Sequence, residues 1–223
     1  MDLDDLRTRL HSVDIPTRLR AVLALRTYSD DLVYPLLGPK LQDPDFAVRT
    51  AVVQLLGDRQ TPQTFDLLLQ QLEQEDDANV QAEIVQALRH FGIPALPVFS
   101  DLISTSTASL TRRTALAALI SFAQQPDLQV NVFNRCVQAL TDSSASVQAM
   151  AIDGLAVYAN TPLRTSAIDK LVPLTSNSHW QIRFSLVKAL RQFDCHQARE
   201  ALLQLSQDPN HHVVGAVLEA LVP

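Results

Sequence analysis

The sequence predicts an all-α fold, a right-handed solenoid of about seven helical hairpins that forms one domain over residues 1–223. An amphipathic phrase recurs along the chain at a nearly constant spacing, and such a period is typical of solenoids. The composition agrees, because 47% of the residues are hydrophobic whereas only 5% are aromatic and only 5 are glycine. Small and medium aliphatic side chains favour closely packed helices over sheets.

The recurring phrase is clearest as VRTAVVQLL, which begins at Val48. Its first, fifth, eighth and ninth positions are apolar or small in every copy, and they fall on one side of a helix because successive residues turn by about 100°. The copies begin at Thr17, Val48, Val80, Thr111, Val147, Ile182 and Val213, at successive spacings of 31, 32, 31, 36, 35 and 31 residues. The two longer spacings predict extended connections between residues 111 and 182.

Each copy is expected to form the second helix of a hairpin. The first helices are predicted at residues 3–10, 32–41, 62–72, 94–103, 128–140, 162–174 and 197–205. Pro62, Pro94 and Pro162 suit helix starts, because proline has a fixed φ and lacks the N–H that would remain unpaired there. The sixth position of the phrase is apolar in all seven copies, and we expect it to pack between consecutive hairpins.

The turn between the two helices of a hairpin carries a second pattern. Asp43 lies six residues before Arg49, and the same spacing separates Ser12 from Arg18 and Asp142 from Gln148. An acid or hydroxyl at the earlier position can cap the second helix and accept hydrogen bonds from the arginine or glutamine of an adjacent hairpin. The pattern therefore predicts a structural ladder along the turns.

Charge and motif content exclude several classes of function. The formal net charge of −6 disfavours a protein that binds nucleic acid by neutralising phosphates. No apolar stretch is long enough to span a membrane, and the N-terminal residues lack the apolar region of a signal peptide, so we expect a cytoplasmic protein without membrane insertion. The two cysteines and six histidines show no metal-ligand spacing, and we expect no metal.

The phrase DPDFAVRTAVVQLLG, with Pro35 eight residues before Asp43 and the pair Val48-Arg49 after it, resembles the HEAT repeat. The period is shorter than the ~40–47 residues typical of HEAT repeats. In this it is similar to the compact repeats of the phycobilin lyase family, the E/F-type lyases and phycobilisome degradation protein B. The resemblance covers essentially the whole chain. It implies binding of phycobiliprotein subunits, assisted bilin attachment, detachment or transfer, and making or breaking of a bilin thioether bond as the activity.

The third, seventh and tenth positions of the phrase point away from the apolar side and are expected to line one face formed by the second helices. This face combines small or apolar residues with flanking cations, which suits either an acidic helix or a flat apolar molecule that carries carboxylates. Its candidate binding residues are Arg89, Arg113, Ala117, Ala149, Asp153, Phe184, Lys188 and Arg191.

Three residues are catalytic candidates. Asp153 is the one acid in the middle of the face, where it would pair with the pyrrole nitrogens of a bound bilin such as phycocyanobilin or, alternatively, with Arg191 or Arg113. Cys195 and His196 place a thiol beside an imidazole. Trp180, two residues before Ile182, is interpreted either as a hydrophobic staple at a helix start or as an interaction hot spot.

Two functions remain open at this point. The first is a phycobiliprotein-binding protein of the bilin lyase or phycobilisome degradation type, which works alone or with a second lyase-like subunit. The second is a noncatalytic adaptor that binds an acidic helix or another partner protein on the same face of the second helices.

Overall fold

A computed structural model describes residues 2–221, and these form fourteen α-helices, five short 3-10 helices and no strand. The α-helices are α1 Leu3–Leu10, α2 Ile15–Ala24, α3 Asp30–Leu37, α4 Phe46–Gly57, α5 Pro62–Gln74, α6 Ala78–Arg89, α7 Leu96–Thr105, α8 Ser109–Ile120, α9 Gln129–Ala139, α10 Ala145–Ala156, α11 Arg164–Leu171, α12 Trp180–Leu190, α13 His196–Leu205 and α14 His211–Leu221. The all-α prediction is confirmed.

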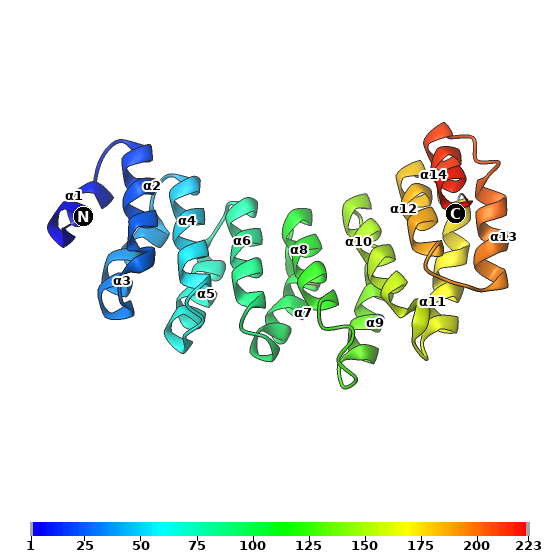
Figure 1. Cartoon of the computed structure of the whole chain (residues 1–223), viewed down its shortest axis with the longest axis horizontal. Coiled ribbons are helices and arrows are strands. Elements are labelled where there is room, and N and C mark those ends of the chain that lie inside the picture. The colour runs from blue at the N-terminus through cyan, green and yellow to red at the C-terminus, as the bar shows by residue number, and fades with distance from the viewer. Residues whose placement is uncertain (1, 222–223) are drawn as a thin grey trace. The chain divides into compact units, whose positions relative to one another are not determined.

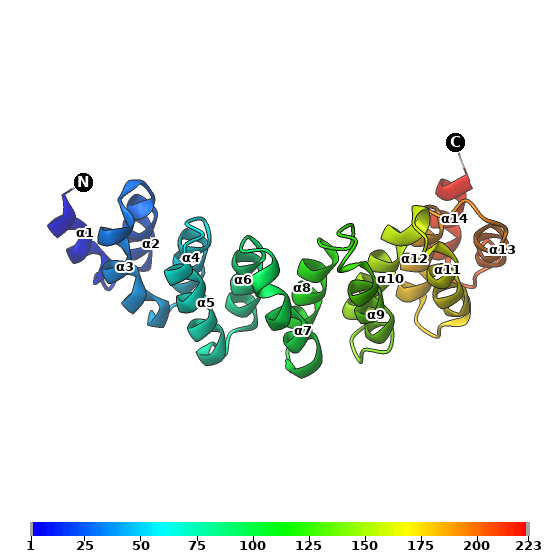
Figure 2. The same cartoon turned by 90° about the horizontal axis from the view of Figure 1, so that it is seen from below.

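The helices pair in chain order into seven hairpins, from α1 with α2 to α13 with α14. The chain divides into two compact units, residues 1–99 and 100–223, and α7 crosses the division. The prediction of one continuous domain stays a prediction. Within the first unit the second helices α2, α4 and α6 pack side by side, and within the second unit α8, α10, α12 and α14 do the same (Figures 1 and 2).

The apolar side of each second helix is buried as the phrase predicts. In α4, for example, Val48, Val52, Leu55 and Leu56 are buried. The sixth position is fully buried in the first six copies, which confirms that it packs between hairpins. In the last copy the same position, Leu218, is 58% exposed, because no further second helix covers it in this structure.

The turns form the predicted ladder, which we call the turn ladder and define by four pairs between consecutive turns: Arg18 with Asp43, Arg49 with Glu75, Arg112 with Asp142, and Arg183 with Asp208. The six-residue spacing has its own cause. Arg49 donates to the main-chain carbonyl of Asp43 at 2.9 Å, so each arginine closes its own turn while it reaches the carboxylate of the next.

The prediction that the turn acid caps the second helix is wrong in detail. The N-cap of α4 is Asp45, whose carboxylate accepts the N–H groups of Ala47 and Val48. Asp43 instead accepts the N–H of Asp45 at 3.1 Å, which closes the turn before the helix. Both acids of the DPD sequence therefore hold backbone donors, one in the turn and one in the helix.

Proline and the longer spacings explain where the first helices differ from prediction. Pro62 begins α5 as predicted, whereas Pro94 lies in a 3-10 turn before α7 and Pro162 lies in a turn before α11. The predicted helix over 162–174 is shorter because Pro173 lacks the N–H that an α-helix would need there, and the chain continues as the 3-10 helix Val172–Ser176. The extra residues between Thr111 and Val147 form the irregular connection 121–128, as expected for an extended hairpin.

Candidate functional site

The predicted binding residues of the second unit lie on three of its second helices. Arg113 and Ala117 belong to α8, Ala149 and Asp153 to α10, and Phe184, Lys188 and Arg191 to α12 and its C-cap. None of these residues is buried, so all of them point away from the helical core as the phrase predicts. Arg89 is exposed at the end of α6 in the first unit, and its part in the same face stays a prediction.

An open hollow of about 380 Å³ lies between α10 and α12. It is lined by Asp153, Ala156, Val157, Lys188, Ala189 and Gln192. The structure therefore brings together two of the predicted site residues, Asp153 and Lys188, from consecutive hairpins. Val157 and Gln192 were not predicted, because they lie beyond the nine residues of the repeated phrase in the turns that follow α10 and α12.

Asp153 has an unusual electrostatic environment for an exposed carboxylate. Desolvation by the surrounding atoms raises the pKa of Asp153 above its ordinary value of 3.8, and the positive charge of Lys188 counteracts part of that rise. Within residues 2–221 the charge that acts on Asp153 comes from Lys188, and the alternative pairing with Arg113 or Arg191 is not seen in the structure. Its carboxylate remains available to a donor group of a ligand.

A row of aromatic side chains extends from this hollow along α12. Lys188 Nζ lies 4.6 Å from the centre of the Phe184 ring, and the Phe184 ring meets the Trp180 ring edge to face at 6.3 Å. The Trp180 ring in turn stacks on His212 of α14, with 5.1 Å between the ring centres. We call Trp180, Phe184, Lys188 and His212 the aromatic row. Residues four apart share one side of a helix, so the row presents π faces and a cation in one line.

Trp180 is not a hydrophobic staple. It is the first residue of α12, whereas a staple residue precedes the N-cap, and its partners are Phe184 and His212. The sequence shows an aromatic residue, Trp180, and an imidazole, His212, near the starts of consecutive second helices. Their stacking could not be predicted, because it depends on side-chain rotamers that the repeat pattern does not specify.

The two cysteines lie in different surroundings. Cys136 is buried in α9, and burial raises the pKa of its thiol to about 12, so it is held in the neutral form. Cys195 is partly exposed before α13. His196 does not turn toward it: its Nδ1 lies 3.2 Å from Glu200 Oε2 one turn further along the helix. The structure thus does not pair His196 with Cys195, and neither residue lines the hollow beside Asp153; their catalytic role stays a prediction.

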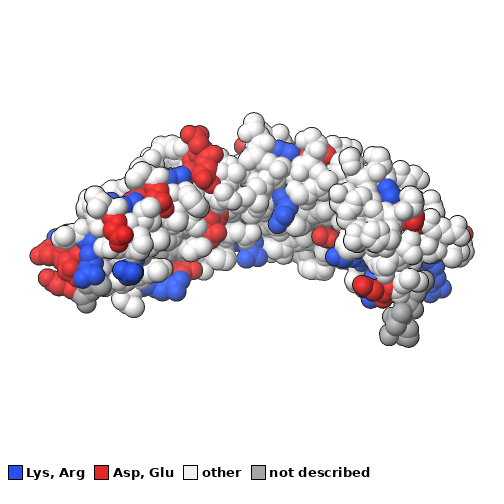
Figure 3. All heavy atoms as spheres, turned by 90° about the horizontal axis from the view of Figure 1, so that it is seen from above, with Lys and Arg blue, Asp and Glu red and all other residues white. Residues whose placement is uncertain are grey.

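The described surface mixes charges of both signs. On the face drawn in Figure 3, lysine and arginine lie among aspartate and glutamate and among wide areas of uncharged residues. Within residues 2–221 no cluster of three or more histidine, cysteine, aspartate or glutamate side chains is arranged to hold a metal ion. Over the same residues, no helix has the length and apolar character needed to cross a bilayer.

Comparison with protein families identifies the repeat. The family model described as HEAT repeats matches residues 3–89, 65–130 and 134–222, which together take in almost the whole chain. The chain belongs to the HEAT-repeat family. Together with the seven hairpins, this confirms the predicted α-solenoid of HEAT-like repeats. The match identifies the repeat class and does not extend to the phycobilin lyase subfamily.

Solved structures resemble this HEAT-repeat chain in fold. An engineered protein has 19% identity and a TM-score of 0.52, with 99% of this chain and 68% of that chain covered. The crystal structure of Kap121p bound to Ste12p has 15% identity and a TM-score of 0.56, with 98% of this chain but 28% of that chain covered. A designed armadillo repeat protein has 20% identity and a TM-score of 0.44, with 99% and 100% covered. No curated protein matches the chain significantly.

Proposed function

We propose that this HEAT-repeat protein is a scaffold that binds a phycobiliprotein subunit and positions its bilin during attachment, detachment or transfer. The observation that carries the proposal is the arrangement around α12, where the aromatic row leads to the hollow that holds Asp153 and Lys188. The resemblance of the repeated phrase DPDFAVRTAVVQLLG to the phycobilin lyase repeats supplies the choice of partner.

The chemistry of a linear tetrapyrrole matches this arrangement. A bilin is flat and conjugated, so it can stack on the rings of Trp180 and Phe184. Lys188 and the exposed Arg191 would pair with its propionates, and the Asp153 carboxylate would accept from protonated pyrrole nitrogens. The raised pKa of Asp153 supports this role. The carboxylate has lost part of its hydration in the hollow, and a ligand N–H would replace the hydrogen bonds that water no longer provides.

In this proposal the chain positions two reactants and does not itself form the covalent bond. A thioether would be made or broken between a cysteine of the partner and the bilin, while the scaffold holds both in register. The surroundings of Cys136 favour such a role, since its buried neutral thiol is a poor nucleophile. A second lyase-like subunit would supply further residues where one scaffold does not suffice.

The test is a binding titration of the purified protein with a phycocyanin subunit, with and without its phycocyanobilin. We expect Lys188→Gln together with Phe184→Ala to weaken binding by roughly tenfold, from the loss of a cation–π pair and its stacking surface. The control is Leu203→Ala on α13, which removes a 67% exposed apolar side chain outside the row. Absence of saturable binding to either form of the subunit would reject the proposal.

Free phycocyanobilin separates the role of Asp153 from that of the aromatic row. We expect its visible absorption band to shift on addition of the protein and to shift less with Asp153→Ala. Identical spectra for the wild type and Asp153→Ala would remove Asp153 from the site and leave the protein contact to be judged by the titration.

The second candidate function is a noncatalytic adaptor for an acidic amphipathic helix. Trp180, Phe184 and Lys188 favour it because they lie four residues apart on α12, the spacing with which one helix presents a stripe to another. Binding of a synthetic helical peptide of net negative charge, sensitive to Phe184→Ala, together with no binding of phycocyanin would select the adaptor over the phycobiliprotein scaffold.

A further inference from the structure

The four pairs of the turn ladder are not alike. Three are two-pronged, with both the Nε and an Nη atom of the arginine bonded to the carboxylate. The donor–acceptor distances are 2.9 and 2.8 Å for Arg49 with Glu75, 2.8 and 2.8 Å for Arg112 with Asp142, and 2.5 and 2.8 Å for Arg183 with Asp208. This fork geometry is the one in which guanidinium and carboxylate groups fit best.

The first pair is open on one side. Arg18 Nη2 donates to Asp43 Oδ1 at 2.9 Å, but Arg18 Nε is buried without a partner. The other carboxylate oxygen, Asp43 Oδ2, has Lys40 Nζ as its nearest ionic partner at 3.9 Å, which is beyond hydrogen-bond distance. Both side chains are more than nine-tenths buried, and a buried nitrogen without a partner, such as Arg18 Nε, is unusual.

The next pair shows what closes such a gap. There Gln71 stands in the place that Lys40 takes beside Asp43, and its Nε2 donates to Glu75 Oε2 at 2.9 Å. Arg49 Nε donates to the same oxygen. The second oxygen of Glu75 thus has two donors within the chain, whereas that of Asp43 has none within hydrogen-bond distance.

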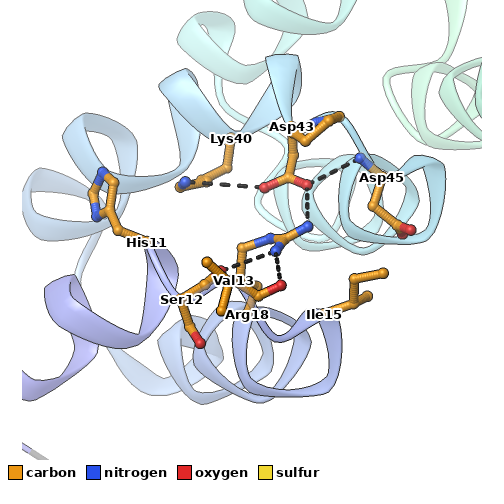
Figure 4. A pocket seen from close by; sticks show the side chains of 9 residues that line it. His11, Ser12, Val13, Ile15, Arg18, Lys40, Asp43 and Asp45 are labelled. Atoms are coloured by element: carbon orange, nitrogen blue, oxygen red, sulfur yellow. Dashed lines mark hydrogen bonds and ion pairs between the residues drawn. The ribbon is translucent and has the colours of Figure 1, made fainter.

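The first pair borders a hollow of about 560 Å³ in the first unit (Figure 4). Its polar lining includes Arg18, Lys40 and Asp43, and its apolar lining includes Val13, Ile15 and Pro44. Val13 is 98% exposed and Ile15 is 39% exposed, so two apolar side chains at the border of the hollow are open to solvent.

We propose that this hollow binds a main-chain amide of an extended, uncharged segment of a partner protein, with an aliphatic side chain of that segment resting on Val13 and Ile15. The carbonyl oxygen of the amide would accept from Lys40, and its N–H would donate to Asp43 Oδ2. An amide thus supplies an acceptor for Lys40 and a donor for the carboxylate oxygen that has none within hydrogen-bond distance.

Charge complementarity selects an uncharged occupant. The two cations that line the hollow, Arg18 and Lys40, are balanced by two carboxylates, Asp43 and Asp45. A carboxylate or phosphate would lie beside Asp43, and an ammonium group would lie beside Lys40, so either would meet a like charge. This site is separate from the aromatic row, so the result of its test does not depend on the phycobiliprotein proposal.

The experiment uses the whole protein and a mimic with a single amide and a leucine-like side chain, N-methyl-4-methylpentanamide, and it follows the backbone amide chemical shifts of the protein by NMR. A ligand of this size is expected to bind with a Kd on the order of 1 mM. The shifts should concentrate in the turn residues 12–18 and 40–45. Methyl 4-methylpentanoate, the matching ester, lacks the N–H toward Asp43 and should bind at least about fivefold more weakly, as expected for the loss of one hydrogen bond to a charged group.

Two variants check the site without disturbing the ladder. Lys40→Met removes the donor and Val13→Ser removes the apolar contact, and each should weaken the amide by several fold. Ile93→Ser, which alters a 63% exposed apolar residue outside the hollow, should leave binding unchanged. Linear shifts without saturation at about tenfold above the expected Kd, or equal binding of amide and ester, would show that water alone fills the open pair and would overturn the proposal.

Discussion

Arg112 and Asp142 are joined by two parallel hydrogen bonds of 2.8 Å, from Nε to Oδ2 and from Nη2 to Oδ1. The same guanidinium donates to the main-chain carbonyls of Ser106 and Thr107 in its own turn. One side chain thus closes a turn and ties it to the turn of the next hairpin. Such a link fixes the register between hairpins, because its geometry tolerates little displacement of either turn.

The first prediction concerns this link. Arg112→Gln keeps a donor for the turn carbonyl, as Gln148 donates to the carbonyl of Asp142, but it removes both bonds to the carboxylate. Since each side chain of the pair is only 12% exposed, we expect the free energy of unfolding to fall by about 2–3 kcal/mol. Urea unfolding followed by circular dichroism measures the change.

An exposed pair provides the matched control for Arg112→Gln. Arg199 pairs with Asp194, and their side chains are 74% and 88% exposed. Because solvent screens such a pair, Arg199→Gln should alter stability by less than about 0.5 kcal/mol. Equal losses for the two variants would contradict the structural role assigned to the turn ladder.

The second prediction is a pH dependence of the same pairs. The hydrogen bonds from Arg112 and Arg183 hold the pKa values of Asp142 and Asp208 below the ordinary value of 3.8. The stability that these carboxylates contribute is therefore present above pH 3.8 and is lost as the pH falls through their lower folded-state values. The stability difference between wild type and Arg112→Gln should be constant near neutral pH and shrink below pH 3.8; a difference that grows in acid would argue against the assignment.

The third prediction rests on a close approach of two second helices. A Cβ added to Gly57 at the end of α4 would lie 2.6 Å from the Cβ of Ala87 and 3.1 Å from its Cα in α6. Backbone atoms cannot yield as a flexible side chain can, so Gly57→Ala should force the helices apart and destabilise the protein by about 1–3 kcal/mol.

The same substitution at Gly215 is expected to change the stability in the opposite direction. No atom lies within 4 Å of a Cβ added there, and Gly215 lies inside α14. Gly215→Ala should stabilise the protein by about 0.5–1 kcal/mol, since alanine loses less backbone entropy in a helix. Thermal unfolding of both variants checks the pair, and a loss of stability in both would show that the space around Gly215 is not open.

The repeated phrase predicted the hairpins because burial follows helical periodicity, and the first helix was predicted with its observed bounds, Leu3–Leu10. The helix caps were less predictable, because Asp43 and Asp45 are both acids in one turn and only the backbone conformation decides which one caps α4. Helical spacing indicated that Asp153 and Lys188 lie away from the apolar side of their helices, but it did not predict the hollow between them. The open side of the Arg18–Asp43 pair was not predicted, because the six-residue spacing is the same whether the arginine makes one or two hydrogen bonds to the carboxylate.

The fourth prediction distinguishes the two thiols. Cys195 is partly exposed, whereas Cys136 is buried with a pKa of about 12, so iodoacetamide should alkylate the native protein at Cys195 alone. Peptide mass spectrometry after short labelling measures the two sites, and unfolding in urea should make both react. Because Cys195 lies apart from the hollow between α10 and α12, its alkylation should leave the binding of a phycocyanin subunit unchanged.

The fifth prediction concerns Asp153 and carries a sign opposite to that of the turn ladder. Its pKa is raised because desolvation in the hollow disfavours the charged form more than Lys188 favours it. Above its folded-state pKa the carboxylate therefore destabilises the fold, and stability improves as the pH falls toward the ordinary value of 3.8. Asp153→Asn removes this charge, so it should be slightly more stable than wild type at pH 7. The advantage should shrink as the pH falls and vanish well below pH 3.8, where the wild-type side chain is neutral in both states. Chemical unfolding at a series of pH values measures the difference.

A gain in stability of Asp153→Asn combined with weaker bilin binding would indicate that Asp153 serves a ligand at a cost to the stability of the fold. A variant less stable than wild type at pH 7 would instead show that Asp153 stabilises the helices around the hollow.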